Sequence, residues 1–346
     1  MDKTSIINLA YVVSSVLFIL GLKNITRPRT AVRGNWLSAC GMLLAIVVTL
    51  FGRDAYALIA LGAVVGSLIG VGLAIKIQMT AMPQLVAIFN GFGGLASVLV
   101  AGSQIIQTDP TETATIIPWD VLTATAVTGL IGAITFSGSL IAFGKLQELP
   151  LFKRPLPIPG NQVVNLVLGV ASIGLAVALI TNASDTAYLW LVIVASVLGI
   201  LLVNPIGGAD MPVVIALLNS YSGLAASATG FVIDNNVLII AGSLVGASGV
   251  ILTNIMCKAM NRSLTNVLFG VMDSGSGTEM TDEMYATVRS TSAEDVAIIL
   301  ESANRVVFVP GYGMAVAQAQ HAVRDLANQL VAQGTAVEYA IHPVAG

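Results

Sequence analysis

A glycine-containing turn near the end of the sequence has residues that could bind a nucleotide. The stretch Gly311-Tyr312-Gly313-Met314-Ala315-Val316 follows a predicted strand and opens a predicted helix. Glycine N–H groups and the positive end of a helix can hold a pyrophosphate at such a turn. However, Val316 stands at the third motif position, and the second predicted strand ends in Ile341-His342 instead of an acidic residue. Two interpretations therefore stay open, a dinucleotide site that suits NADP better than NAD and a tight turn without a ligand.

Two asparagines lie inside apolar segments that repeat each other. Residues 82–97 align without gaps on residues 211–226 with seven identities in sixteen positions, which makes Asn90 and Asn219 equivalent. Each is predicted about 12 Å into a helix, near the middle of a roughly 30 Å hydrocarbon core. A mid-membrane asparagine commonly forms a hydrogen bond between helices. A symmetry-related pair also suits a hydrated polar seam, and the sequence leaves both readings open.

Asp210 and three glycines complete the candidate residues of the apolar region. Asp210 directly precedes the second repeated segment. It could cap the helix that begins at Met211, or collect and release protons at the end of the polar seam. Gly242, Gly246 and Gly249 recur at spacings of four and three, so they lie on one helix face. That face predicts close helix packing, with a sliding contact as the alternative.

The composition indicates that a membrane surrounds the elements that position these residues. Of the 346 residues, 56% are apolar and 10% are charged, and the mean hydropathy is +0.89. Because soluble domains carry about 25% charged residues, an ordinary soluble enzyme is excluded. The net charge of −3 indicates no nucleic-acid partner. Cys40 and Cys257 are predicted to be buried spectators, and no metal site is expected.

Apolar runs near the length of a membrane span occur nine times along the chain. They cover residues 5–22, 36–51, 56–74, 82–102, 121–144, 162–181, 188–203, 211–233 and 237–257. The short runs 36–51 and 188–203 would have to cross the bilayer nearly untilted. Connections on one side carry ten Lys and Arg residues and those on the other carry two, which predicts an outside N-terminus and a cytoplasmic C-terminal region.

The distribution of acidic residues divides the chain. Nine of the 18 lie between Asp273 and Glu338. We predict an α-helical polytopic membrane bundle over residues 1–260, a linker or hinge over 261–290, and the start of a partial α/β, Rossmann-like NADP-binding domain over 291–346. In the last part we expect a capping box opened by Thr291, with Ser292 as the alternative cap. A buried strand at 306–309, a helix from Met314 to about Gln333 and a strand at 337–341 should follow.

Several long motifs together resemble one family. They are Gly207-Gly-Ala-Asp210-Met-Pro-Val-Val214, Leu218-Asn219-Ser-Tyr-Ser-Gly223, Ile255-Met-Cys-Lys258-Ala-Met-Asn-Arg262-Ser263, Pro310-Gly-Tyr-Gly-Met-Ala-Val-Ala-Gln-Ala-Gln320 and Ile341-His-Pro-Val-Ala-Gly346. The sequence resembles the beta subunits of proton-translocating NAD(P) transhydrogenases over its whole length. The resemblance implies an NAD(P)+ transhydrogenase of the proton-pumping class (Si-specific/Re-face type), in which inward proton movement drives hydride transfer from NADH to NADP+. It also implies a place in the bacterial inner membrane.

The resemblance also implies cofactors, partners and residue roles. This subunit would hold NADP(H), an alpha subunit would hold NAD(H), and the assembly would be a dimer of alpha-beta units in the lipid bilayer. No side chain would be catalytic, because hydride passes directly between the nicotinamides. The implied proton-pathway residues are Asn90, Asp210, Asn219 and Ser248. The implied coupling residues are Gly242, Gly246, Gly249, Lys258 and Arg262, and the implied NADP-binding residues are Gly311, Tyr312, Gly313, Met314, Ala315, Val316 and His342.

Two departures from the family pattern shape these expectations. Some members carry a histidine where this chain has Asn90, whose amide cannot titrate, so we expect a histidine of the alpha subunit to carry the proton. The chain ends soon after the second predicted strand, although a Rossmann-type sheet needs more strands. We therefore expect the sequence to be incomplete at its C-terminus, with activity only in a complete complex. The alternatives are a transporter or channel with a nucleotide-sensing tail, and an inactive truncated subunit.

Overall fold

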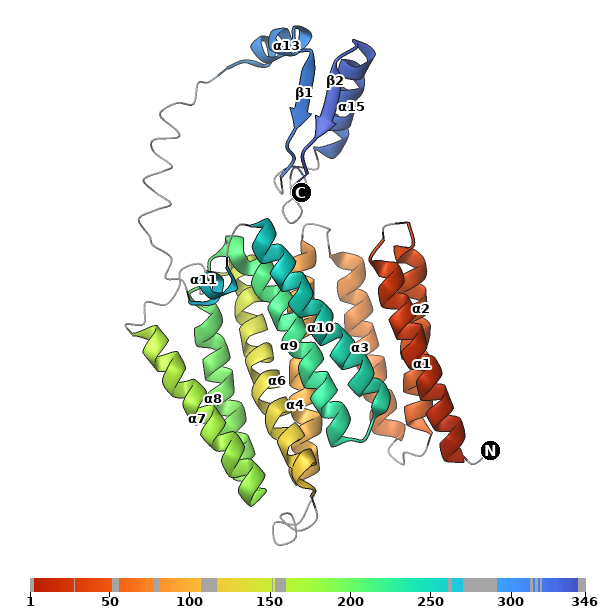
Figure 1. The fold of residues 1–346 in the computed structure, drawn as a ribbon, viewed down its shortest axis with the longest axis vertical. Helices are drawn as coiled ribbons and strands as arrows, with labels where there is room; N and C mark the ends of the chain where they lie inside the picture. The colour runs from red at the N-terminus through yellow and green to blue at the C-terminus, as the bar shows by residue number, and fades with distance from the viewer. Residues whose placement is uncertain are drawn as a thin grey trace. The chain divides into compact units, whose positions relative to one another are not determined.

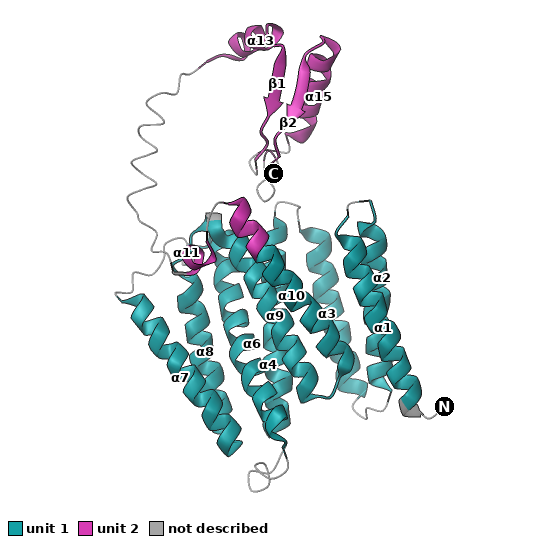
Figure 2. Cartoon of the chain, in the orientation of Figure 1, with its two compact units in different colours: residues 1–253 teal, residues 254–346 magenta. Residues whose placement is uncertain are grey.

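The chain is described by a computed structural model. It covers residues 3–27, 29–51, 56–77, 81–106, 117–150, 152, 160–260, 263–269, 291–311, 314, 317 and 319–341. These residues fall into two compact units, Met1–Thr253 and Asn254–Gly346 (Figure 2). The first unit is a bundle of long helices, and the second contains short helices and a pair of strands.

Nine helices in the described residues are long and apolar enough to cross a membrane (Figure 1). They are α1 (Lys3–Ile25), α2 (Ala31–Leu50), α3 (Tyr56–Lys76), α4 (Met82–Ile106), α6 (Trp119–Leu146), α7 (Asn161–Asn182), α8 (Asp185–Val203), α9 (Met211–Val232) and α10 (Asn236–Ala259). Each contains one of the predicted apolar runs or most of it, so the prediction of nine spans is confirmed for this part of the chain.

Two of these helices, α2 and α8, begin three or more residues before their apolar runs. α2 starts at Ala31, five residues before the predicted run, because its first five residues include the polar Arg33 and Asn35, which a count of apolar residues leaves out. α8 starts at Asp185, after Ser184, whose side chain accepts a hydrogen bond from the N–H of Ala187. Polar residues suit a first turn, where backbone N–H groups lack helical partners. With 20 and 19 residues, both helices approach the ordinary length of a span.

The centre of the bundle is formed by α4, α6 and α9, which contact one another. Within their most apolar windows, 50%, 61% and 61% of the residues are buried, against 0% for α3. α4 and α6 meet at Gly94 and Gly132, where a Cβ on either residue would lie 2.7 or 2.8 Å from the carbonyl oxygen of the other. Such backbone contacts supply the van der Waals packing that associates helices in lipid.

The repeated segments form equivalent helices. α4 and α9 are neighbours and run in the same direction through the bundle (Figure 1). The short 3-10 helix η2 (Gly208–Asp210) leads directly into α9. The two copies of the sequence repeat therefore lie side by side in parallel, with Asn90 and Asn219 on adjacent helices.

The second unit contains the expected strand-helix-strand order. β1 (Arg305–Phe308) and β2 (Ala336–Tyr339) pair in parallel, with Arg305 opposite Ala336, and α15 (Gln320–Ala332) packs on β2. α11 (Leu264–Phe269) and α13 (Ala293–Glu301) precede them. Two parallel strands are compatible with a Rossmann-like sheet and do not by themselves define one.

The start of α13 differs from the first expectation. Ser292, the alternative cap, is the N-cap, and Thr291 is not. The hydroxyl of Ser292 accepts a hydrogen bond from the N–H of Asp295 (3.2 Å), and the Asp295 carboxylate accepts one from the N–H of Ser292 (3.3 Å). This backbone hydrogen bond is the main cause that lowers the pKa of the Asp295 carboxyl. The capping box therefore has aspartate in the position where glutamate was expected.

Three further expectations are corrected. The helix expected from Met314 is interrupted: Met314 is helical, Ala317 and Ala319 lie in a turn, and α15 begins at Gln320. The N–H of Ala319 donates to the Met314 carbonyl (3.0 Å), five residues back, whereas an α-helix bonds four residues back. β1 alternates between exposed and half-buried residues instead of being buried, since the described part of this unit places little against it. Cys257 is buried as expected, but Cys40 is exposed, because neighbouring Gly41 faces α1.

Candidate functional site

The glycines of α10 face α9. A Cβ added to Gly242 would overlap the backbone nitrogen of Ser227, and one added to Gly249 would lie 2.8 Å from Cα of Ser220. A Cβ on Gly246 would lie 3.0 Å from the side chain of Leu224. The three glycines therefore form one packing face against α9, which agrees with their spacing.

Serines on α9 complete this contact. The Ser220 hydroxyl donates a hydrogen bond to the Gly246 carbonyl (2.7 Å), and the hydroxyls of Ser227 and Ser243 lie 2.9 Å apart. Gly223 lies between the two α9 serines, and a Cβ there would be 2.5 Å from the backbone nitrogen of Gly246. We call this contact the glycine-serine face. It comprises Ser220, Gly223 and Ser227 of α9 with Gly242, Gly246 and Gly249 of α10.

The sequence analysis named the α10 half of the face and missed the α9 half. The overlooked signal is the spacing of Ser220, Gly223 and Ser227, at three and four residues, which matches the spacing of the glycines opposite. Small residues at helical spacing on two neighbouring spans indicate a mutual contact more strongly than a stripe on one span.

Asn90 connects the two repeated helices. Its side chain is buried, and its amide nitrogen donates a hydrogen bond to the Ile215 carbonyl on α9 (3.3 Å). In an α-helix this same carbonyl accepts the N–H of Asn219, four residues later. The structure therefore shows a hydrogen bond between helices at Asn90 and places it beside the turn that carries the half-buried Asn219. A hydrated seam stays a prediction.

Asp210 lies at the end of η2, immediately before α9, and only 4% of its surface is exposed. Its side chain makes no capping hydrogen bond to α9, so the structure does not support the capping interpretation. Ser248, the other residue assigned to the proton pathway, is exposed on the bundle, and its hydroxyl donates to the Val245 carbonyl of its own helix (3.0 Å). Ser248 therefore lies beside the glycine-serine face and not in it.

Lys145 is a polar residue of the bundle that the sequence analysis used only as a charge. It extends from the last turn of α6, and its Nζ atom contacts carbonyl oxygens of Val203, Asn204 and Ile206. These carbonyls belong to the end of α8 and to the connection that leads to Asp210. No pattern in the sequence predicts these acceptors, which follow it by 58 to 61 residues.

The candidate nucleotide residues are only partly described. Gly311 follows β1, and a Cβ added to it would meet no atom of the described residues within 4 Å. Its carbonyl accepts a hydrogen bond from the N–H of Met314 (3.1 Å). Lys258 is exposed in the last turn of α10. The other residues assigned to the nucleotide and the hinge lie outside the described residues: Arg262, Tyr312, Gly313, Ala315, Val316 and His342.

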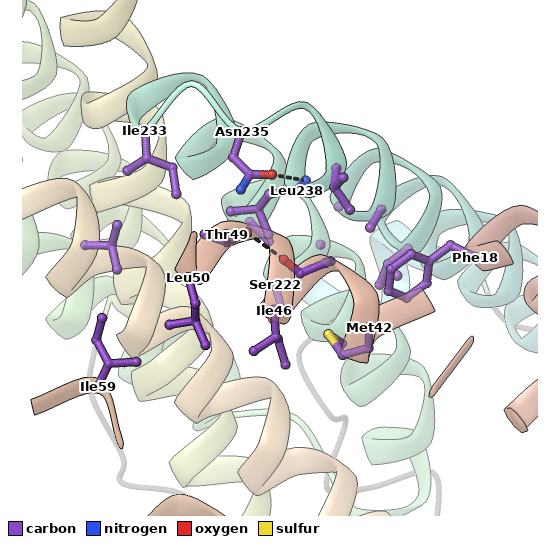
Figure 3. Close-up of a pocket in the computed structure, with 18 of the residues that line it drawn as sticks. Phe18, Met42, Ile46, Thr49, Leu50, Ile59, Ser222, Ile233, Asn235 and Leu238 are labelled. Carbon is purple, nitrogen blue, oxygen red and sulfur yellow. Dashed lines mark hydrogen bonds between the residues drawn. The ribbon is translucent and has the colours of Figure 1, made fainter. Parts of the chain in front are cut away.

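A cavity of about 920 Å³ lies among α1, α2, α3, α4, α9 and α10 (Figure 3). Its few polar side chains include Thr49, Ser222 and Asn235, and the side-chain Oδ1 of Asn235 accepts a hydrogen bond from the N–H of Leu238 (3.0 Å). None of the described residues that line the cavity is charged. It therefore offers no ion-pairing group for a charged solute.

These features define the class of protein. The first unit is a polytopic membrane bundle whose central helices pack through glycine and serine, with an asparagine pair on two parallel helices and a buried aspartate at the start of one. The family described as NAD(P) transhydrogenase beta subunit matches residues 7–346. This chain belongs to that family.

Individual relatives agree with this assignment. Two curated relatives named NAD(P) transhydrogenase subunit beta, both from Rhodospirillum rubrum and one of them from a specified strain, are each 48% identical to this chain over 343 residues. The match covers 97% of this chain and 74% of each relative. The family expected from the sequence motifs is therefore confirmed, and the transporter and channel alternatives are not favoured.

Proposed function

We propose that this chain couples inward proton movement through its helix bundle to hydride transfer from NADH to NADP+, together with an alpha subunit. The observation that carries the proposal is the buried hydrogen bond from Asn90 to the α9 turn before Asn219. It joins the two repeated helices in the middle of the bundle. Polar groups at that depth are expensive in lipid and usually serve a function.

Proton movement supplies a driving force that the hydride step lacks. The two nicotinamides are chemically alike, so their exchange of hydride lies near equilibrium. Moving one charge through about 150 mV releases roughly 3.5 kcal/mol, which shifts a product ratio by about 2.5 decades. One proton per hydride is therefore sufficient to favour NADPH.

The proposed pathway runs along α4 and α9. Amides cannot titrate, so Asn90 and Asn219 orient water, a histidine of the alpha subunit carries the proton, and Asp210 forms the cytoplasmic end. The orientation rests on lysines. α1, α3 and α6 end at one side of the bundle (Figure 1), and each has a lysine in its last turn, namely Lys23, Lys76 and Lys145. The positive-inside rule assigns that side to the cytoplasm of a bacterial cell.

The glycine-serine face provides the mobile contact of the proposed mechanism. Because backbone meets backbone there, α10 can shift along α9 without repacking large side chains. α10 continues to Lys258 and towards Arg262, the proposed hinge. A protonation-dependent shift of α10 would thus change the affinity for NADP(H).

NADP(H) is proposed to bind at the turn after β1. Ligands of parallel α/β sheets bind at the carboxyl ends of strands, and the space that the described residues leave beside Gly311 suits a close approach of phosphate to the backbone. Gly311, Tyr312, Gly313, Met314, Ala315, Val316 and His342 would hold the nucleotide, and bound NADP+ would accept the hydride. NAD(H) would bind to the alpha subunit, in a dimer of alpha-beta units.

The pathway is tested by Asn219→Leu in proteoliposomes that contain the complete alpha-beta complex. We expect proton pumping per hydride to fall by about tenfold or more, because leucine removes a water-binding amide and a barrier of about 1.4 kcal/mol is enough for tenfold. Asn236→Leu, at the exposed start of α10, is the matched control and should pump normally. A pH-sensitive dye reports pumping, and normal pumping by the Asn219 variant would contradict the proposal.

A further inference from the structure

We infer that Lys145 is a positioning residue for the cytoplasmic end of the pathway. Its ammonium group anchors residues 204–210, the connection that carries Asp210, to the end of α6. The inference rests on the proposed function, because it takes Asp210 as the end of the proton pathway. Lys145 would not itself exchange protons with the pathway.

The ammonium group of Lys145 contacts three backbone carbonyl oxygens. Nζ lies 3.3 Å from the Val203 carbonyl oxygen and 2.7 Å from that of Ile206, and it also contacts that of Asn204. An ammonium group has three N–H donors, so each donor has a carbonyl acceptor. The arrangement requires the charged form, since a neutral amine has fewer N–H groups to donate.

The position of these acceptors explains why a cation is needed there. The last carbonyls of a helix have no helical partners, and the helix dipole makes that end partly negative. α8 has no basic residue in its own last turn. Lys145 therefore supplies from α6 the positive charge that α8 lacks, and it ties the two helix ends together.

The anchored connection is short and is buried at Asn204, Ile206 and Asp210, so its position determines the position of Asp210. The N–H of Ile206 donates to the Val203 carbonyl (3.2 Å), and the N–H of Asp210 donates to the Gly207 carbonyl (3.1 Å). Ile206, Asp210 and the following Met211 expose 4%, 4% and 0% of their surfaces. Because such a segment has little room to move, releasing its anchor should displace Asp210 and the first turn of α9.

A comparison with other lysines separates this role from membrane orientation. Lys23 and Lys76 end α1 and α3 and are exposed, which is all that the positive-inside rule needs. Lys145 is half-buried, which costs solvation free energy that an exposed lysine does not lose. The three carbonyl acceptors therefore explain the half-buried position of Lys145 better than the positive-inside rule does.

The test uses Lys145→Met and Lys145→Arg in the complete alpha-beta complex, reconstituted in proteoliposomes. Methionine keeps the apolar stem without N–H donors, whereas arginine keeps the charge and the donors. We expect Lys145→Met to lower the proton-coupled rate about tenfold. The rate of hydride exchange that does not require NADP(H) to dissociate should change less than about twofold. Lys145→Arg should restore most of the coupled rate. Lys76→Met is the matched control and should leave both rates unchanged.

The results distinguish a wrong role for Lys145 from a wrong proton pathway. A normal coupled rate in Lys145→Met overturns the inference, as does an equal loss of both rates that arginine does not rescue. If Lys145→Met does not accumulate in the membrane, Lys145→Gln replaces it, because glutamine keeps N–H donors without a charge, and it is judged by the same outcomes. Asp210→Asn is measured in parallel. If Asp210→Asn has a normal proton-coupled rate, Asp210 is not the end of the proton pathway. If Asp210→Asn loses the proton-coupled rate while Lys145→Met keeps it, only the role of Lys145 is refuted.

Discussion

Helices α10 and α3 each carry a row of glycines, but the described residues of this chain cover only the row on α10. On α10, Gly242 and Gly249 lie against backbone atoms of α9. On α3, Gly62, Gly66 and Gly70 recur every four residues, and a Cβ on any of them would have no atom within 4 Å in the described structure. The α10 stripe is thus covered within this chain, and the α3 stripe is open in it.

The difference lies in the partner helix and not in the stripe. A glycine stripe makes a groove, but close packing needs a second helix with small residues at the same spacing. α9 supplies Ser220, Gly223 and Ser227, and Ser220 adds a hydrogen bond across the contact. The spacing of glycines therefore predicts a face that is able to pack, and the neighbouring helix decides whether it does.

Among these substitutions, Gly242→Ala should lower the stability of the α9–α10 contact most. The added methyl group would overlap the backbone of Ser227, so α9 and α10 must separate, and overpacking of this kind costs about 1–3 kcal/mol. We expect a clear loss of thermal stability of the complex in detergent and a reduced proton-coupled rate. Gly66→Ala on α3 is the matched control and should leave the stability of the isolated subunit unchanged or slightly higher.

Ser220→Ala should have a smaller effect, because it removes one hydrogen bond and keeps the close contact. A net loss of about 0.5–1.5 kcal/mol is expected. Ser172→Ala is the matched control, since the buried Ser172 hydroxyl donates within its own helix, to the Leu168 carbonyl (2.8 Å). Thermal unfolding monitored by circular dichroism compares the two variants. Equal stability losses would show that the bond between α9 and α10 adds nothing beyond an ordinary serine bond.

Ser292→Ala should have the smallest and most local effect. No residue of α13 is buried, so its capping box is the main contact that holds its first turn. Replacing a serine N-cap by alanine costs about 1 kcal/mol of helix stability. Hydrogen exchange of the α13 amides should accelerate in this variant, and Thr291→Ala, which does not remove the N-cap, should change it less. Unchanged exchange in Ser292→Ala would show that the cap does not hold α13.

The same helix should respond to pH. The hydrogen bond from the Ser292 N–H lowers the pKa of the Asp295 carboxyl in the folded helix. The contribution of Asp295 is therefore fully present above the pKa of the unfolded carboxyl and is lost as the pH falls through the lowered folded value. After correction for intrinsic exchange, protection of α13 should decline in acid, and Asp295→Asn should reduce this decline.

Much of the bundle could be predicted from sequence, because hydropathy reports membrane spans directly. All nine spans in the described residues were anticipated, with boundary errors of a few residues, as at the polar start of α2 and the end of α4. The tail was less predictable. The helix expected from Met314 is interrupted by a turn before α15 begins at Gln320, because a turn that closes five residues back has no clear signature in glycine and alanine spacing.

From the amino-acid sequence alone we could recognise the apolar spans, the repeat that makes Asn90 and Asn219 equivalent, the glycine face of α10 and the motifs of the family. Tertiary structure alone decided that α9 covers that face, that Asn90 donates to the Ile215 carbonyl, and that Lys145 holds the end of α8. The physical reason is distance along the chain. Hydropathy and helical spacing are local properties, whereas Asn90 and its acceptor are 125 residues apart. Such partners meet only when the helices pack.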